Sequence, residues 1–231
     1  WDVSKEMMPA RIKAGLRREN AAPLIHVPNA LFPSQIRYLP MQKLEPYSLV
    51  FAGTIGPENG LDLAIEALAL ARKQLPQLKL HILGAGLKED EELAKTLVKK
   101  LHLEQYVANH GFVSDLSQLS EKLSHYMVGL APYRAVPWSV RWYGDATKLR
   151  LYFANGLPVI TTHVPPLGHE TAEKGCAIVV KDTKGELAKA IVTMLSDRQK
   201  YSTYREAAIR FAKNNTWENT YKNALKEMGY R

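Results

Sequence analysis

The sequence predicts an α/β fold, a Rossmann-like parallel sheet with helices on both faces. Short apolar segments alternate with amphipathic helical patterns along the 231 residues of the chain. The apolar segments lack an alternation of polar and apolar residues, as is typical of strands whose two faces are both buried. They end in glycine or polar residues, where the chain would leave the sheet for a helix.

Seven segments are the expected strands: Leu24–Val27, Ser48–Gly53, Lys79–Gly84, Val107–Gly111, Tyr126–Ala131, Pro158–Thr161 and Cys176–Val180. The segments between them have helical periodicity, for example in the four-residue spacing of Leu93, Leu97 and Leu101. Thr183 is expected to cap one later helix and Asn215 the last one. In such a sheet, ligands bind beyond the carboxyl ends of the strands, so function is expected in the loops that lead into helices.

Composition excludes several classes of protein. The single cysteine, Cys176, excludes a disulfide framework and a cysteine-based zinc cluster within one chain, and it fits a reducing compartment such as the cytoplasm. No apolar run approaches the ~18–20 residues of a membrane span. The seven histidines show no zinc-motif spacing, so we expect no metal. The net charge of +8 could attract phosphates, nucleic acid or anionic lipid. The basic segment 198–213 also contains aromatic residues, but the packing of an amphipathic helix explains them better than nucleic-acid binding does.

The first glycine-rich loop, Gly53–Gly60, follows an expected strand and precedes a helix. Its glycines would let backbone amides approach an anion at the start of that helix. Leu61 stands where a P-loop requires lysine, so a P-loop kinase or ATPase is disfavoured. The alternative is that the glycines only serve turns.

The second loop begins with Gly84-Ala-Gly86, which is similar to the start of a dinucleotide fingerprint. Glu89 stands at the third glycine position and three further carboxylates follow it, so a nicotinamide site is rejected. Gly84 and Gly86 would still let a ligand approach the backbone.

The most informative run is Tyr143–Ile160, which predicts a helix followed by a strand. Asp145 is expected to cap this helix, with Ala146, Thr147 and Lys148 in its first turn. A lysine there opposes the helix dipole unless an anion or Asp145 lies nearby. The alternative is that Lys148 reaches solvent.

The order of motifs resembles that of a known family. The chain is similar to the C-terminal, nucleotide-sugar-binding half of GT-B glycosyltransferases of family 4, the glycosyl transferases group 1. The resemblance rests on six segments that span nearly the whole chain: His26–Phe32, Phe51–Leu63, Leu80–Gly86, Val107–Val113, Lys148–Ile160 and Thr216–Glu218.

The resemblance implies an enzyme that transfers a sugar from a UDP- or GDP-sugar to a glycan or lipid-linked acceptor, as in polysaccharide biosynthesis, with no metal or other cofactor. Residues 1–24 would be the tail of a missing N-terminal domain and a linker. Residues 25–231 would be the nucleotide-sugar-binding domain with its closing helix, and this fragment alone would not be expected to catalyse transfer. We expect a cytoplasmic location, and the charge is compatible with peripheral association at the cytoplasmic membrane face.

The chain departs from the family pattern at four positions. Thr54 and Asn59 replace the arginine and lysine of the first loop, and Tyr143 and Leu151 replace two glutamates. A charge-assisted hydrogen bond is worth about 1.5–3 kcal/mol, so substitutes are required if the diphosphate still binds. The alternatives are a non-catalytic relative that keeps the sheet for binding, or an unrelated nucleotide-binding or flavodoxin-like module.

Lys148, the amides of residues 146–148, and Arg134 or Arg141 are the expected substitutes. Backbone near Gly111 would hold the base, and Asp145 would hold a sugar or ribose hydroxyl. The residues expected to bind substrate are Gly53, Thr54, Gly56, Asn59, Gly84, Gly86, Gly111, Phe112, Val113, Arg134, Arg141, Asp145, Ala146, Thr147 and Lys148.

Overall fold

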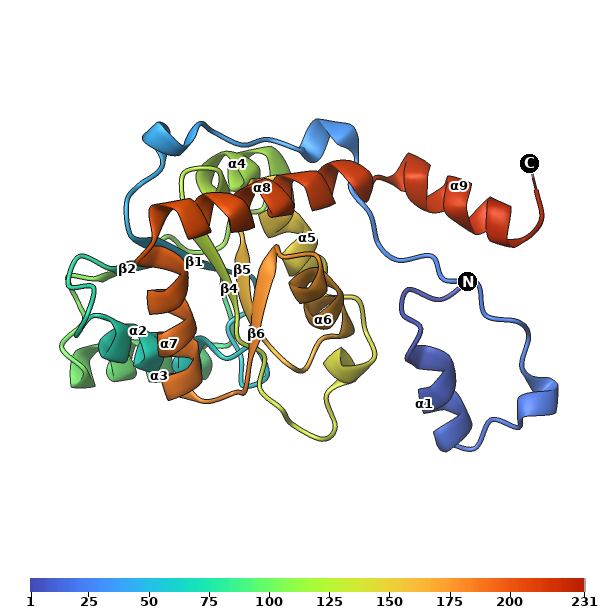
Figure 1. Ribbon diagram of the computed structural model, residues 1–231. Helices are drawn as coiled ribbons and strands as arrows, with labels where there is room; N and C mark the ends of the chain where they lie inside the picture. Colours follow the sequence, from blue (N-terminus) through green and yellow to red (C-terminus); the bar gives the residue numbers. More distant parts are fainter. Residues whose placement is uncertain (231) are drawn as a thin grey trace.

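A computed structural model describes residues 1–230, which contain a six-stranded parallel sheet in the order β3-β2-β1-β4-β5-β6 (Figure 1). The predicted Rossmann-like fold is therefore confirmed. Val50 in β1 pairs with His81 in β2 on one side and with Gly129 in β4 on the other. The strands are β1 (Ser48–Ala52), β2 (Lys79–Leu83), β3 (Val107–Asn109), β4 (Val128–Ala131), β5 (Val159–Thr162) and β6 (Ala177–Val180).

Six of the seven expected strands form, and each lies within a residue or two of its predicted bounds. The prediction for Leu24–Val27 is wrong, because its His26 makes only an isolated bridge to Asp2. Pro23 and Pro28 flank this segment. Neither proline can donate a backbone hydrogen bond, so the segment cannot extend a ladder at either end.

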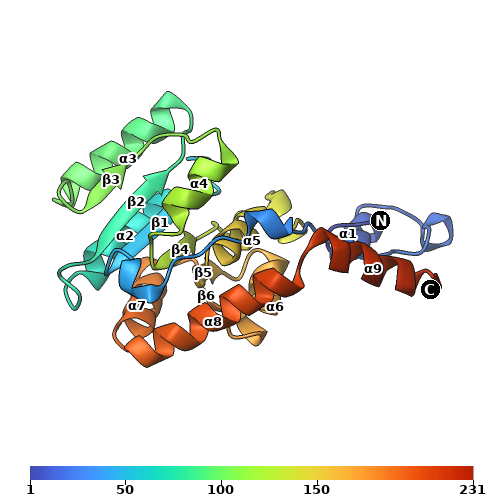
Figure 2. The same cartoon turned by 90° about the horizontal axis from the view of Figure 1, so that it is seen from above.

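Helices cover both faces of the sheet (Figures 1 and 2). One face packs against α2, α3 and α7, and the other against α4, α5, α6 and α8. The bounds are α2 (Leu61–Ala71), α3 (Lys88–Lys100), α4 (Leu116–Leu123), α5 (Thr147–Ala154), α6 (Pro166–Glu173), α7 (Lys184–Leu195) and α8 (Arg198–Asn214).

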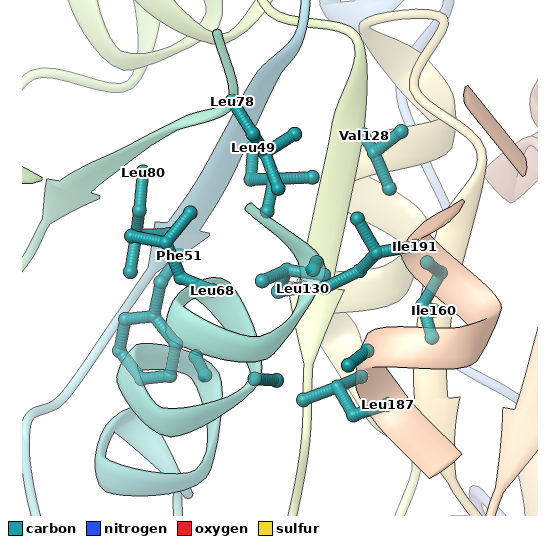
Figure 3. Close-up of a cluster of buried hydrophobic side chains, with 14 of the residues drawn as sticks. Leu49, Phe51, Leu68, Leu78, Leu80, Val128, Leu130, Ile160, Leu187 and Ile191 are labelled. Carbon is teal, nitrogen blue, oxygen red and sulfur yellow. The ribbon is translucent and has the colours of Figure 1, made fainter. Parts of the chain in front are cut away.

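The two cores alternate along each strand, as the pleat requires. In β1, Leu49 and Phe51 face the core beneath α2 and α7, which Figure 3 shows, whereas Val50 and Ala52 face the core beneath α5. All five residues of β1 are buried, which agrees with the apolar run Leu49–Ala52 that predicted this central strand.

Tyr152 of α5 links β1 and β4 near their carboxyl ends. Its hydroxyl accepts a hydrogen bond from Ala52 N (2.7 Å) and donates one to Leu130 O (3.1 Å). Gly129 makes room for this ring, because a Cβ there would lie 2.5 Å from it. Helix α5 is thereby fixed to β1 and β4 together.

The last helix, α9 (Trp217–Glu227), and the first, α1 (Met7–Lys13), lie beyond the end of the sheet (Figure 2). The ring centroids of Trp1 and Tyr221 are 6.0 Å apart, so the start of the chain contacts α9 there. The predicted cap of α9 is wrong by one residue, because Thr216 and not Asn215 accepts the amide of Asn219.

Two other local predictions are confirmed. Thr183 caps α7 by accepting the amide of Glu186 at 3.4 Å. Tyr201 and Phe211 of the basic helix α8 are buried, as helix packing requires. Across residues 1–230, no helix combines the length and the hydropathy needed to span a membrane.

Candidate functional site

The strand order identifies one crevice at the carboxyl edge of the sheet. The chain runs outward from β1 through β2 to β3, and then returns to continue through β4, β5 and β6. The order reverses between β1 and β4, and open parallel sheets bind ligands beyond their strand ends at this point. The loops that follow β1 and β4 therefore flank the expected binding site.

Lys148, in the first turn of α5, extends its side chain into this crevice. Its Nζ lies 4.3 Å from the ring centroid of Phe51 and 5.0 Å from that of Tyr133. The residue is half-buried, but the Nζ atom itself is sealed from solvent and has no hydrogen-bond partner among residues 1–230. The alternative in which Lys148 extends into solvent is therefore wrong.

A buried and unpaired ammonium is electrostatically costly. Burial, and after it repulsion from Arg141, lowers the pKa of Lys148 from the usual 10.5 to about 7. The two aromatic rings offset part of the cost through their negative faces. An anion bound beside Nζ would offset far more of it.

Arg141 supplies a second cation near Lys148. Its guanidinium carbon lies 4.9 Å from the ring centroid of Tyr133, the ring that also contacts Lys148, and its Nε is buried without a partner among the described residues. Burial raises the pKa of the Tyr133 hydroxyl to about 12, so this ring stays neutral between the two cations. Two like charges around one ring indicate a site for an anion.

The loop that carries Arg141 is held in shape by its neighbours. Ser139 Oγ donates to Glu58 Oε2 at 2.6 Å, and Trp142 Nε1 donates to Val136 O at 2.9 Å. The first of these bonds links the loop after β4 to the loop after β1, and the second braces the loop after β4 internally. Arg141 is thus positioned by contacts on both sides of the crevice.

Gly53 leaves the space that Lys148 occupies. A Cβ on Gly53 would lie 3.3 Å from Lys148 Cε and 3.4 Å from Nζ, and its φ of +123° is a conformation that other residues rarely adopt. The first glycine loop therefore meets Lys148 directly, as the two motifs together predict.

A cavity of about 310 Å³ opens beside this contact. Gly53, Thr147 and Lys148 among the predicted residues line it, together with Asn29, Arg150 and Leu151. Leu151 is the residue that stands at a family glutamate position, so the cavity offers an apolar side chain where the family has a carboxylate.

Asp145 does not cap α5, so that prediction is wrong. Ala146 occupies the cap position and is buried, while Asp145 accepts Asn29 N at 2.7 Å and Arg150 Nε at 3.0 Å. Both partners of this ion pair have side chains that are almost wholly buried. Asp145 therefore ties the segment before the sheet to the start of α5.

The pairing of Asp145 with Arg150 and Asn29 was not anticipated from the sequence. Asn29 lies 116 positions from Asp145, and a contact across such a separation leaves no local pattern. Arg150 lies five positions after Asp145, a spacing that does not by itself place two side chains on one helix face. Arg150 Nη1 has no hydrogen-bond partner within residues 1–230, although it is buried.

The remaining residues of the first loop and Arg134 lie apart from Lys148. Arg134 approaches Asp62 to 3.9 Å, and with Gly56 it lines a second cavity, of about 560 Å³, between α2 and α3. Thr54 is exposed and Asn59 is buried. Of the two candidate arginines, the structure places only Arg141 with Lys148.

Gly84 and Gly86 allow a close contact between two loops. A Cβ on Gly84 would lie 1.9 Å from Gly53 O, and one on Gly86 would lie 2.1 Å from Ile55 O. The second glycine loop thus supports the first from behind. The space beside both glycines is filled by protein backbone in this structure.

Gly111, Phe112 and Val113 follow β3 at the same edge of the sheet. Gly111 has a φ of +70°, and Phe112 is 73% exposed, so this loop presents backbone and an uncovered ring. None of the three lines the Lys148 cavity. Their predicted contact with a base stays a prediction.

Metal-binding groups do not gather in this part of the molecule. Within residues 1–230, no three histidine, cysteine, aspartate or glutamate side chains lie close enough to hold an ion. The cations near the crevice are Lys148, Arg141 and Arg150, and of these Lys148 and Arg150 line the cavity of about 310 Å³.

The chain matches the model of one known protein family. The family model described as "Glycosyl transferases group 1" matches residues 46–197, about two thirds of the chain. The chain belongs to this family. The match covers all six strands, β1 to β6, and both loops of the crevice, so the resemblance seen in the motifs is confirmed.

Curated relatives in the glycosyl transferases group 1 family are similar over most of the chain. The GtfA subunit of a UDP-N-acetylglucosamine–peptide N-acetylglucosaminyltransferase of Streptococcus parasanguinis is 28% identical over 68% of the chain and 29% of its own length. The D-inositol 3-phosphate glycosyltransferase of Jonesia denitrificans is 30% identical over 74% of the chain and 40% of its own length. The chain thus corresponds to less than half of either relative.

Solved structures share the fold. Anabaena HepE in complex with UDP and glucose superposes with a TM-score of 0.78 at 20% identity, covering 99% of this chain and 62% of HepE. Pneumococcal GtfA in complex with UDP and GlcNAc gives a TM-score of 0.74 at 20% identity, covering 99% of this chain and 45% of GtfA. Each of these proteins is larger than the chain described here.

Proposed function

We propose that this chain is the donor-binding part of a glycosyltransferase that transfers a sugar from a UDP- or GDP-sugar to a glycan or lipid-linked acceptor. The family membership and the strand order support a nucleotide-sugar site at the β1–β4 crevice. Two similar proteins point to UDP as the nucleotide: the GtfA subunit belongs to a UDP-N-acetylglucosamine–peptide transferase, and HepE was solved with UDP and glucose. The acceptor would bind in an N-terminal domain, of which residues 1–24 would be the tail and the linker.

The observation that carries the proposal is the buried, unpaired Nζ of Lys148. Burying a charge without a partner is unfavourable, and such groups usually coordinate an ion or a ligand. Lys148 and Arg141 around Tyr133 would replace the family arginine and lysine, whose positions are Thr54 and Asn59 here. The diphosphate would also meet the amide end of α5, where helix N–H groups attract anions.

Each part of the site would then have a role in transfer. The leaving diphosphate gains negative charge as the sugar departs, and cations fixed beside it stabilise that charge more in the transition state than in the ground state. Lys148 must be protonated for this role. A bound diphosphate would favour its charged form and so raise its pKa again.

The experiment is a thermal-unfolding panel of the chain with UDP, GDP, NAD and inorganic pyrophosphate. A ligand at about 100 times its Kd stabilises by about 2.7 kcal/mol, which is roughly 5–10 °C in Tm for a chain of this size. We expect UDP or GDP, and not NAD, to produce this shift. A flat response to all four ligands would rule out the donor site.

A second function has one specific observation in its favour. Leu151 lines the Lys148 cavity at the position of a family glutamate, so the site lacks a carboxylate that would hold a hydroxyl. A non-catalytic relative that uses the fold to bind a partner would tolerate this loss. A Tm that none of the nucleotides raises would favour this second function.

Location and membrane association are part of the same proposal. The single cysteine and the net charge of +8 support a cytoplasmic protein that can associate peripherally with an anionic membrane face. Sedimentation with anionic and neutral vesicles at low and high salt would test the association. Binding that is equal for both vesicle types would argue against it.

A further inference from the structure

Three polar side chains form a row beneath the loop that follows β3. Glu45 precedes β1, His81 lies in the middle of β2, and His110 follows β3. His81 Nε2 is 3.2 Å from Glu45 Oε2, and His81 Nδ1 is 3.1 Å from His110 Nε2. His81 is only 8% exposed, so the middle member of the row is buried.

The carboxylate of Glu45 favours one arrangement of the protons along the row. A carboxylate oxygen at 3.2 Å repels a nitrogen lone pair and so favours the tautomer of His81 with its proton on Nε2, although this contact lacks hydrogen-bond geometry and Nε2 has no hydrogen-bond partner among residues 1–230. Its Nδ1 is then an acceptor. In that tautomer, His110 carries a proton on Nε2 and donates it to His81 Nδ1 across the 3.1 Å contact.

The surroundings keep both imidazoles neutral. The His81 ring stacks on the ring of Tyr126, with centroids 4.4 Å apart, and lies edge to edge with the His110 ring, with centroids 5.4 Å apart and 13° between the imidazole planes. Burial is the main cause that lowers the pKa of both histidines below the usual 6.5. Lys79, 3.4 Å from the carboxylate, and Lys122, near His110, act in the same direction, whereas the carboxylate opposes them.

His110 is the last fixed point before the exposed loop. Its backbone amide donates to Ile82 O at 2.9 Å, and Gly111 N donates to Asn109 Oδ1 at 2.9 Å. Phe112 is 73% exposed and gives little packing. These two bonds hold the backbone at the start of the loop, and the contact of the His110 imidazole with His81 is the side-chain contact next to them.

We infer that the row of Glu45, His81 and His110, called here the Glu-His-His relay, positions the Gly111–Val113 loop to receive the base of the nucleotide. This inference rests on the proposed function for its ligand. His110 is a positioning residue in it, because it acts through the loop backbone. Glu45 sets the tautomer of His81, which in turn makes His110 a donor.

The relay responds to acid in two steps. The first added proton leaves one donor and one acceptor between the imidazoles, so the 3.1 Å bond survives. A second proton places two N–H groups face to face and breaks it. Loop order should therefore be lost only when both histidines are charged.

The test uses His110→Ala and His110→Gln in the whole chain, with exposed His125→Gln as the control. The glutamine amide nitrogen falls near the place of Nε2 and can still donate to His81, whereas alanine cannot. The probes are UDP and inorganic pyrophosphate, which lacks a base. Amide exchange of residues 111–113 and the imidazole nitrogen shifts of His81 are measured without any nucleotide.

We expect His110→Ala to weaken UDP binding about five- to tenfold, to leave pyrophosphate binding unchanged, and to speed exchange of residues 111–113 at least about threefold. His110→Gln and His125→Gln should retain wild-type values. Equal UDP affinity in His110→Ala and wild type, or a His81 proton found on Nδ1, would overturn the relay while leaving the donor site intact. Failure of the wild type to bind either probe would refute the proposed function and, with it, the base-binding role of the relay.

Discussion

Replacing Lys148 with methionine should separate binding from stability at the crevice. Methionine has a similar length and no charge, so Lys148→Met keeps the packing against Phe51 and Tyr133 while removing the buried ammonium. We expect the unliganded variant to be more stable than the wild type at pH 7, and to bind UDP or GDP at least tenfold more weakly.

The magnitude follows from the two pKa values of Lys148. The unfolded chain holds the proton up to about 10.5, whereas burial in the native state lowers the pKa to about 7. Each pH unit between these values corresponds to about 1.4 kcal/mol, which places the cost of burying the lysine at about 4 kcal/mol at pH 7. After allowing for the aromatic contacts, we expect a gain of about 2–3 kcal/mol, or roughly 5–10 °C in Tm.

The stability of the wild type should depend on pH for the same reason. Between about pH 7 and 10.5 the unfolded state binds more protons at Lys148 than the native state, so this residue makes the wild type more stable as the pH rises. Below pH 7, Lys148 is protonated in both states, so the native state bears the full free-energy cost of burying its charge. Lys148→Met lacks this contribution, so the two stability curves should converge toward pH 10.5.

The assay is urea unfolding at several pH values between 6 and 10, with Lys189→Met as the matched control. Lys189 is an exposed lysine in α7, and its replacement should change the stability by less than about 0.5 kcal/mol at every pH. If Lys148→Met were less stable than the wild type at pH 7, with a gap that does not depend on pH, the lysine would not be a buried, unpaired charge.

Three further substitutions test other parts of the site. Gly53→Ala should weaken nucleotide binding severalfold and lower the free energy of unfolding by about 1–3 kcal/mol, because the new Cβ would lie 3.3 Å from Lys148 Cε and φ at this position is +123°. Calorimetry would measure the binding and urea unfolding the stability. Wild-type values in both measurements would contradict this prediction. Arg150→Met should cost about 3–5 kcal/mol because Asp145 is left buried without its cation, and adding Asp145→Asn should recover part of that loss in a double-mutant cycle. Tyr152→Phe should cost about 1–3 kcal/mol because it leaves Ala52 N unpaired, and it should speed amide exchange at that residue; an unchanged exchange rate would speak against the bridge.

The central strands β1, β4 and β5 were predictable from the sequence because they are buried at every position. Ser48–Ala52 is buried at every position, and a short apolar run between turn residues is typical of a strand in the middle of a parallel sheet. Leu24–Val27 has a similar composition but lies between two prolines, and it pairs only at His26. Periodicity alone does not weigh such flanking residues.

The site was predictable only in part. Lys148 was identifiable because a lysine in the first turn of a helix conflicts with the helix dipole, and such conflicts often mark function. Arg134 and Arg141 looked equivalent in the sequence, yet one approaches Asp62 and the other approaches Tyr133. Their separation depends on how the loop after β4 folds, which no local pattern encodes.

The hydroxyl of Tyr152 has a consequence for how the crevice works. Because it accepts the amide of Ala52 and donates to Leu130 O, the ends of the two central strands are spaced apart by a side chain, instead of closing on each other through ladder bonds. The helix that holds these two strand ends is the one that carries Lys148. A ligand arriving there would find its charged contact already oriented, so little conformational entropy should be lost by this half of the protein on binding.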